Sequence, residues 1–383
     1  MLKASARSNV EPFIAMDVLA AAAKLEAAGQ RIVHMEVGQP GAPAPVSVLA
    51  AAAESLRGGR LSYTEAVGIA PLRARIARHY QDAYGVVVPA DRIMITTGSS
   101  AAFNIAFLGA FDPGARILMA APGYPAYRNI LRALGLVAVE VPVGADTRWA
   151  LTASHVEEFH RRTSLAGVLI ASPANPTGTM TEPEEIGRLA ALCDALGIRL
   201  ISDEIYHGLV YSGRADTAAR FSDQAIIVNS FSKYYCMAGW RVGWMVLPHD
   251  LVRPFERLAQ SLYISAPELS QRAAIAAFDA TEDLEAVKTE YAESRDLLLE
   301  RLPVLGFDEL LPVDGAFYVY ASVARFTNDA AKFAERMLAE AGVAATPGAD
   351  FDPARGHRYI RFSFAGRNAE VAEGIQRLER WLA

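Results

Sequence analysis

The chain has 383 residues, of which 52% are hydrophobic and 21% charged, and its formal net charge is −6. This composition is ordinary for a globular enzyme, and the length favours two domains over one simple core. The arginines are scattered and the charge balance is acidic. Both features argue against the basic face that a nucleic-acid partner requires.

The cysteines and histidines give no sign of a disulfide framework or a metal site. Cys193 and Cys236 are too few and too isolated for either. His155 and His160 have the wrong spacing for two zinc ligands on one helix face. The N-terminal residues contain no uninterrupted apolar segment, and no stretch approaches the ~20 apolar residues of a membrane span. We therefore expect no signal peptide, no membrane partner, and a reducing, cytoplasmic location.

Short apolar runs alternate with helical patterns along the chain, which is typical of an α/β protein. Strands are predicted at residues 31–37, 92–97, 117–121, 136–141, 167–172, 198–202, 225–228, 317–321 and 359–364. Helices are predicted at residues 46–56, 70–84, 101–111 and 184–196, and from about residue 282 onward.

The predicted strands before residue 280 are continuously apolar, as strands covered on both faces by helices are. We therefore predict a large, doubly wound, mostly parallel sheet domain over residues 46–280. After residue 281 the pattern changes to a long helix and an α+β stretch. We predict that this stretch, residues 281–383, forms a smaller α+β domain together with the N-terminal arm, residues 1–45.

The most informative polar segment is Ser230-Phe231-Ser232-Lys233, which follows a predicted strand and leads to Arg241. A lysine just past a buried strand suits a Schiff-base role, because burial and nearby charge readily lower its pKa. The hydroxyls and Arg241 would then bind a phosphate. The alternative is an ordinary surface lysine on a turn.

Asp203 also lies at the end of a predicted strand, and Tyr206 follows three residues later. A carboxylate there is costly unless it meets a cation, such as the protonated ring nitrogen of pyridoxal phosphate (PLP). Tyr206 would reach the phenolic oxygen of the same ring. The alternative is a structural aspartate that caps the next helix.

Two weaker segments also follow predicted strands. Asn175 stands between prolines, and a rigid amide there can donate to a cofactor oxygen, although such a segment is more often a plain turn. Ser99 and Ser100 stand at a strand–helix junction, where backbone N–H groups bind phosphate. Many α/β proteins carry Gly-Ser at such a junction without a ligand.

In this order, the four segments resemble the class I/II aminotransferases, which are fold-type-I PLP enzymes. The resemblance rests on SFSKYYCMAGWRVG (230–243), SPANPTG (172–178) and DEIY (203–206). It is supported by VGQP (37–40), YTEAVGIAPLR (63–73), APGYPAY (121–127) and YIRFSF (359–364). Together these segments extend over nearly the whole chain.

The resemblance implies an aminotransferase that moves the amino group of an L-α-amino acid to a 2-oxo acid by a ping-pong mechanism. Lys233 would form an aldimine with PLP and shuttle the proton. Asp203 would pair with the pyridinium nitrogen, and Asn175 and Tyr206 would bond the ring's 3′-oxygen. Tyr124 would stack on the ring.

The same resemblance implies how the phosphate and the subunits are arranged. Ser99, Ser100, Ser230 and Arg241 would hold the phosphate. Tyr63 would reach the phosphate of the partner subunit's cofactor, which implies a homodimer with shared active sites.

On the substrate side, the resemblance implies that Arg361 grips the α-carboxylate through two parallel hydrogen bonds, which a lysine would not reproduce. Gly38, Asn175 and Tyr124 would line the same side. No second arginine is assignable to a side-chain carboxylate. This weakens aspartate as a substrate and leaves the donor open among aspartate, alanine, aromatic and branched-chain amino acids.

Two alternatives are kept. A C–S β-lyase would use the same Lys233 and Asp203 but release ammonia and pyruvate. A non-catalytic PLP-binding regulator would need a helix-turn-helix domain, for which the chain has no spare residues. A dehydrogenase is disfavoured because no G-x-G-x-x-G follows a predicted strand.

Overall fold

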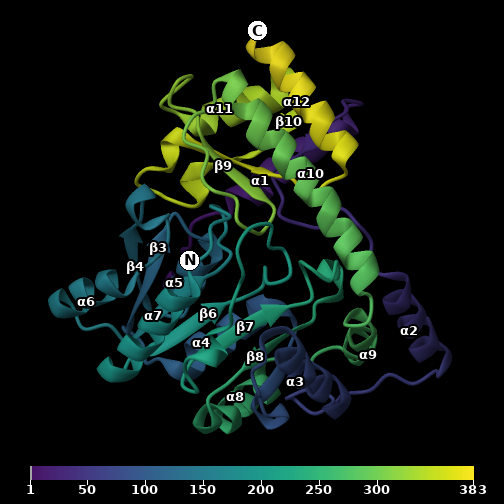
Figure 1. Ribbon diagram of the computed structural model, residues 1–383, viewed down its shortest axis with the longest axis vertical. Helices are drawn as coiled ribbons and strands as arrows, with labels where there is room; N and C mark the ends of the chain where they lie inside the picture. The colour runs from purple at the N-terminus through teal and green to yellow at the C-terminus, as the bar shows by residue number, and fades with distance from the viewer. Residues whose placement is uncertain (1) are drawn as a thin grey trace.

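The computed structural model describes residues 2–383, in which helices and strands alternate along the chain (Figure 1). The helices are α1 (Ile14–Ala27), α2 (Val46–Arg57), α3 (Ala70–Tyr84), α4 (Gly98–Ala110), α5 (Pro125–Ala133), α6 (Ala153–Arg162), α7 (Pro183–Leu196), α8 (His249–Leu262), α9 (Glu268–Ala277), α10 (Thr281–Leu305), α11 (Ala330–Arg336) and α12 (Asn368–Leu382). The strands are β1 (Val33–His34), β2 (Ile93–Thr96), β3 (Arg116–Ala121), β4 (Val137–Pro142), β5 (Gly167–Ala171), β6 (Arg199–Asp203), β7 (Ile226–Ser230), β8 (Gly243–Val246), β9 (Tyr318–Ser322), β10 (Val343–Ala344), β11 (Thr346–Pro347) and β12 (Tyr359–Ser363).

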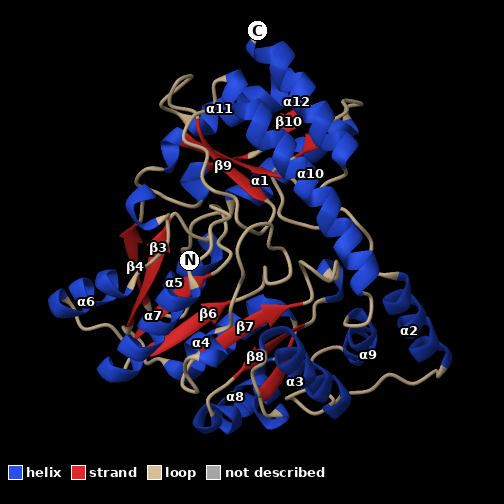
Figure 2. Ribbon diagram, viewed as in Figure 1, coloured by secondary structure: helices blue, strands red, loops and turns tan. Residues whose placement is uncertain are grey.

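The large sheet has the strand order β2-β8-β7-β6-β5-β3-β4. The neighbours from β7 to β4 pair in parallel. β8 runs antiparallel to both β2 and β7. Figure 2 shows this sheet in the lower half of the molecule with helices around it. The predicted α/β fold with a mostly parallel sheet is therefore confirmed.

Two hydrophobic cores flank this sheet. One packs α2, α3, α6, α7 and α9 against one face, and the other packs α4, α5 and α8 against the opposite face. Successive strand residues enter different cores: Ile226 lies in the second core and Ile227 in the first. Because side chains alternate between the two faces, both faces demand apolar residues. This explains the unbroken apolar runs in the sequence.

A smaller sheet lies in the C-terminal part, with the antiparallel order β11-β12-β9. Beside it, β1 from the N-terminal segment pairs in parallel with β10. A separate core joins β1, β9 and β12 to α10, α11 and α12. In Figure 1, α10 (green) extends from the lower part of the molecule into this upper part. The domain boundaries at residues 46 and 281 stay a prediction.

β8 is the strand of the large sheet that the sequence did not predict, and the helices α1, α5, α6, α8 and α9 were not predicted either. β8 is four residues long, and it directly continues the segment from Lys233 to Arg241. Its pairing of Trp244 with Asn229 of β7 and with Ile95 of β2 inserts it between strands that are distant in sequence. Such a short strand carries little periodic signal, and its place depends on non-local pairing.

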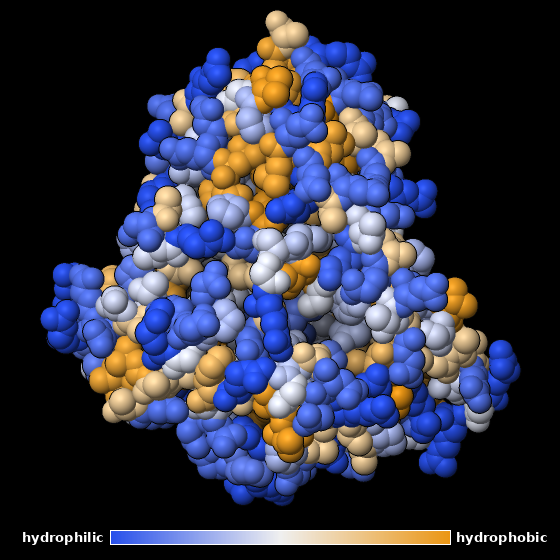
Figure 3. Space-filling model, viewed as in Figure 1, coloured by the Kyte–Doolittle hydropathy of each residue, from blue (hydrophilic) through white to orange (hydrophobic). Residues whose placement is uncertain are grey.

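The face shown in Figure 3 is largely hydrophilic, with an apolar area in the upper half between α11 and α10 and a hollow near the middle. Within residues 2–383, no helix is both long and apolar enough to cross a membrane.

His34 ties α1 to the chain segment that leads into the small sheet. Its Nε2 lies 3.1 Å from Glu26 Oε1 of α1, and its Nδ1 lies 2.8 Å from Glu36 Oε1. The hydrogen bond with Glu36 raises the pKa of His34 from 6.5 to about 9, although partial burial opposes this change. The folded protein therefore holds the proton more tightly than the unfolded chain does.

The His34 contacts should stabilise the fold fully below pH 6.5 and lose this effect as the pH rises through about 9. We expect His34→Gln to lower the thermal midpoint most at about pH 6, with the difference from wild type narrowing as the pH approaches about 10. Calorimetry between about pH 6 and about pH 10 measures this difference in thermal midpoint. His357→Gln is the control for losing an exposed imidazole. A difference that stays constant with pH would contradict the assignment.

Candidate active site

A cavity of about 360 Å³ opens at the carboxyl ends of β5 and β6, where parallel sheets bind their ligands. Segments from the small sheet and from α1 complete its wall. Ten of the residues expected from the sequence line it: Gly38, Ser99, Ser100, Tyr124, Asn175, Asp203, Tyr206, Lys233, Arg241 and Arg361.

Ser230 and Tyr63 do not line this cavity. The hydroxyl oxygen of Ser230 lies 2.9 Å from Ser232 Oγ and 3.3 Å from the Val242 carbonyl oxygen, and Ser232 faces the cavity in its place. Tyr63 is 80% exposed on the outer surface. Its expected role concerns a partner subunit rather than the cavity of its own chain.

Asp203, the last residue of β6, is buried at the bottom of the cavity. Its Oδ1 accepts a hydrogen bond from the backbone N–H of Ile205 at 3.2 Å, and its Oδ2 accepts one from the Tyr127 hydroxyl. Burial raises the pKa of Asp203 from 3.8 to about 6, against the opposing effect of these donors. An ionised carboxylate buried in this place would be stabilised by pairing with a cation.

Lys233 projects into the cavity from the loop after β7. Its ammonium donates to the carbonyl oxygen of Gly38 at 2.6 Å and lies 5.7 Å from the centre of the Tyr206 ring. Burial, followed by the nearby charge of Arg361, lowers the pKa of Lys233 to about 8. The uncharged amine that a nucleophile or proton carrier requires is therefore more accessible near neutral pH than it is for an ordinary lysine.

Arg361, on β12, is fully buried between two aromatic rings. Its guanidinium carbon lies 4.3 Å from the centre of the Tyr318 ring and 4.7 Å from that of Phe351. One terminal nitrogen donates to Asn175 Oδ1 at 2.9 Å, and the other donates to the carbonyl oxygen of Glu36. Within residues 2–383, its buried Nε has no hydrogen-bond partner. An unsatisfied donor in a planar guanidinium fits a carboxylate ligand.

The part of the cavity beside the first turn of α4 suits a phosphate. Ser99 and Ser100 lie in the first turn of α4, where backbone N–H groups point outward. Arg241 comes close beside them, because a Cβ atom on Gly98 would lie 2.5 Å from its Nη2. Gly98 also has a φ of +74°, which favours glycine. The turn thus places hydroxyls, backbone donors and a guanidinium together.

An aromatic wall closes one side of the cavity. The ring of Tyr124, at the start of α5, lies edge-to-face against Tyr127 at 5.2 Å and against Phe13 at 5.8 Å. Phe13 immediately precedes α1, so the N-terminal segment covers the site.

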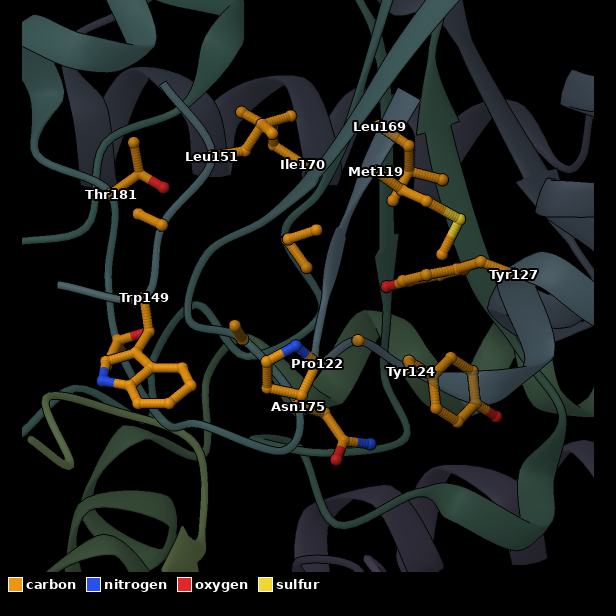
Figure 4. Close-up of a pocket in the computed structure, with 16 residues that line it drawn as sticks. Met119, Pro122, Tyr124, Tyr127, Trp149, Leu151, Leu169, Ile170, Asn175 and Thr181 are labelled. Carbon is orange, nitrogen blue, oxygen red and sulfur yellow. The ribbon is translucent and has the colours of Figure 1, made fainter. Parts of the chain in front are cut away.

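A second, smaller cavity of about 30 Å³ lies behind Tyr124 and Asn175. Figure 4 shows Trp149 and Tyr124 at opposite sides of it, with Pro122 and Asn175 between them. This space is enough for about one water molecule and too small for an amino acid. The larger cavity is therefore the candidate active site.

Sequence reasoning did not single out Tyr127 or Tyr318. It included Ser232 among the hydroxyls expected to bind a phosphate, but the resemblance assigned that role to Ser230. Tyr127 and Ser232 lie within APGYPAY and SFSK, two segments that carry the resemblance. Their position in these segments is the sequence signal that could have identified them as site residues. Tyr318 begins a short strand of the small sheet and carried no local signal. Its place in the cavity depends on how β9 and β12 pack against the large sheet.

The cavity fits pyridoxal phosphate by charge and by donor set. Among the described residues, the charged groups that line it are Lys233, Arg241, Arg361 and Asp203, so positive charge exceeds negative. A phosphorylated cofactor and a substrate carboxylate would balance this excess. The buried Asp203, between the donors and the lysine, offers the counter-ion that the ring nitrogen requires.

Tyr127→Phe removes one hydrogen-bond donor from the Asp203 carboxylate. Because that donor favours the charged form, the pKa of Asp203 should rise above its present value of about 6. We expect the acid limb of the pH–activity profile to move up by about one pH unit. Tyr235→Phe removes another buried tyrosine hydroxyl outside the cavity and serves as the control. An unchanged acid limb in Tyr127→Phe would show that this hydrogen bond does not act on Asp203.

Comparison with known proteins agrees with this geometry. The model of the family "Aminotransferase class I and II" matches residues 30–378. The chain is 48% identical to valine–pyruvate aminotransferase from Mycobacterium tuberculosis, over 98% of this chain and 97% of that protein. A crystal structure of an aminotransferase from M. tuberculosis superposes with a TM-score of 0.97, at 48% identity, covering 100% of this chain and 99% of that one.

A more distant structure, aspartate aminotransferase from Thermus thermophilus with maleate, superposes with a TM-score of 0.92 at 30% identity, covering 99% of this chain and 100% of that one. These relatives are all named as aminotransferases and match along their whole length, which does not favour the lyase or the regulator. The chain belongs to the class I and II aminotransferases and is a pyridoxal-phosphate-dependent aminotransferase that acts on amino acids and 2-oxo acids.

Proposed function

We propose that this aminotransferase takes an apolar L-α-amino acid as its donor and a small 2-oxo acid such as pyruvate as its acceptor. The observation that carries the proposal is the cavity wall contributed by the N-terminal segment and α5. This wall is apolar, and its side chains include Phe13, Ala15, Met16, Val37 and Ile130. An aliphatic side chain would gain free energy by leaving water for such a wall.

The charges of the cavity support the same conclusion. Among the described residues, its cations are Lys233, Arg241 and Arg361. We assign them to the amine chemistry, the phosphate and the α-carboxylate, so none remains for a carboxylate on the substrate's side chain. The relative from M. tuberculosis is named for valine and pyruvate, which belong to these two substrate classes.

In this proposal, bound pyridoxal phosphate supplies the electron sink that makes the substrate's α-carbon acidic. Ser99, Ser100 and Arg241 hold its phosphate, with Ser232 facing the same space. Asp203 holds the ring nitrogen in its protonated form.

The other side chains act on the substrate and on the ring oxygen. Arg361 binds and orients the α-carboxylate, and Lys233 takes and returns the α-proton. Asn175 retains its amide N–H group for the ring oxygen, since its Oδ1 is already occupied by Arg361. Tyr206 supplies a hydroxyl to the same oxygen.

The test of this function compares L-valine with L-aspartate as donors to pyruvate, in wild type and in Arg361→Ala. We expect a higher kcat/KM for valine in the wild type. In Arg361→Ala, the KM for donor and acceptor should rise, corresponding to about 2–4 kcal/mol of lost binding, because a buried charged contact is removed. Arg361→Lys is the matched control, which keeps the charge without the planar pair of donors. A preference for aspartate would contradict the donor class, and unchanged KM values would remove Arg361 from the carboxylate site.

We further propose that the chain forms a homodimer with shared active sites. Thr64 donates its backbone N–H to Ser265 Oγ at 3.2 Å, so the exposed segment at Leu61–Tyr63 lies beside the one at Leu262–Ile264. Exposed apolar side chains gather on this surface and on the neighbouring α2: Val46, Leu49, Leu61, Tyr63, Leu262 and Ile264. Contiguous exposed apolar surface is typical of protein–protein interfaces.

Mixing two defective variants tests the shared site. We expect Tyr63→Ala and Lys233→Ala homodimers each to have little activity. After exchange of subunits, mixed dimers should regain one intact site, because the Tyr63→Ala subunit keeps its own Lys233 and receives Tyr63 from its partner. Activity after mixing measures this, and sedimentation analysis checks the dimer. No recovery in verified mixed dimers would show that Tyr63 serves its own chain.

A further inference from the structure

Tyr318 occupies a central place in the cavity that the proposed mechanism does not use. It begins β9, its side chain is fully buried, and it lines the cavity. Its hydroxyl lies 2.7 Å from the hydroxyl of Tyr206. The guanidinium of Arg361 lies over its ring, 4.3 Å from the ring centre. A single side chain thus touches the group assigned to the substrate carboxylate and a group assigned to the ring oxygen.

The neighbouring backbone is shaped around this tyrosine. A Cβ atom added to Gly38 would lie 1.7 Å from the Tyr318 hydroxyl oxygen and under 3.0 Å from its ring. Any side chain at position 38 would therefore displace Tyr318. The carbonyl oxygen of Gly38 also accepts the Lys233 ammonium. Gly38 is thus needed for the close approach of Tyr318 as well as for space on the substrate side.

We propose that Tyr318 is a positioning residue with two separable parts: its ring fixes the Arg361 guanidinium for the carboxylate, and its hydroxyl orients Tyr206 toward the cofactor's ring oxygen. This inference rests on the roles proposed above for Arg361 and Tyr206. It does not depend on which amino acid is the donor.

The ring and the hydroxyl of Tyr318 act through different interactions. A guanidinium is attracted to the face of an aromatic ring, and Phe351 on its other side completes a fixed slot. The hydroxyl acts by hydrogen bonding. When Tyr318 donates to the Tyr206 oxygen, the Tyr206 hydrogen remains free for an acceptor in the cavity. Such a chain of hydroxyls also polarises Tyr206 and strengthens it as a donor.

Two measurements separate the role of the Tyr318 ring from that of its hydroxyl. Binding of isovalerate, a carboxylic acid without an amino group, measured by calorimetry, reports the Arg361 slot without turnover. The pH at which the visible absorbance of the bound cofactor changes reports the hydrogen bonds to its ring oxygen. Thermal midpoints of all variants are measured beside both to establish that each one folds.

Tyr318→Phe keeps the ring and removes the hydroxyl. We expect isovalerate to bind as in wild type, and the absorbance change to move to higher pH, because the charged ring oxygen loses part of its stabilisation. Tyr318→Leu removes both parts and should also weaken isovalerate binding by about tenfold. Tyr320→Phe, on the same strand, removes a buried hydroxyl that has no partner within residues 2–383, and should change neither readout.

A double-mutant cycle with Tyr206→Phe gives the decisive comparison. Because the Tyr318 hydroxyl acts through Tyr206, adding Tyr318→Phe to Tyr206→Phe should cause no further shift in the absorbance pH. Independent, additive shifts would overturn the coupling through Tyr206. Unchanged isovalerate binding in a folded Tyr318→Leu would overturn the role of the ring. If Arg361→Ala itself left isovalerate binding unchanged, the proposed carboxylate role of Arg361 would be at fault, and not Tyr318 alone.

Discussion

The site depends on one short piece of backbone, Glu36 to Gly38, which holds two buried cations by its carbonyl oxygens. Arg361 donates to the oxygen of Glu36, and Lys233 donates to that of Gly38. A buried charge is costly unless it is hydrogen-bonded, so these carbonyls set where both side chains can lie. The segment is itself anchored to the small sheet, since Ser363 donates to the oxygen of Met35 and Thr346 to that of Glu36. The lysine of the large sheet and the arginine of the small sheet are therefore placed by a common support.

The electrostatic properties of the cavity follow from this placement. Lys233 and Arg361 are close enough that the arginine's charge adds to burial in lowering the lysine's pKa. Burial raises the pKa of Asp203, and the hydrogen bonds from Tyr127 and from the Ile205 backbone N–H oppose this rise. Burial thus moves the pKa of Lys233 down and that of Asp203 up, each toward neutral pH. That displacement is what general acid–base chemistry requires.

The sequence predicted most strands of the large sheet, with bounds close to those observed, and ten of the residues that line the cavity, because these depend on local patterns. α3 has the bounds that its apolar spacing indicated, and the segments around Asn175, Asp203 and Lys233 each follow a strand at the same edge of the sheet. What the sequence could not supply depends on packing between distant segments. Tyr318 reaches the cavity only through the pairing of β9 with β12. β8 was missed for the same reason, since its place between β2 and β7 has no local signature. Ser232 faces the cavity, whereas the Ser230 hydroxyl, which is hydrogen-bonded to it, does not line the cavity.

The most direct test of this account is a single half-reaction with the purified holoenzyme and no acceptor. We expect L-valine alone to yield one equivalent of its 2-oxo acid per active site, change the visible absorbance of the cofactor, and then stop. Pyruvate added afterwards should restore the starting absorbance and yield one equivalent of alanine. Release of ammonia, or continued turnover of valine without an acceptor, would contradict amino-group transfer as the reaction of this site.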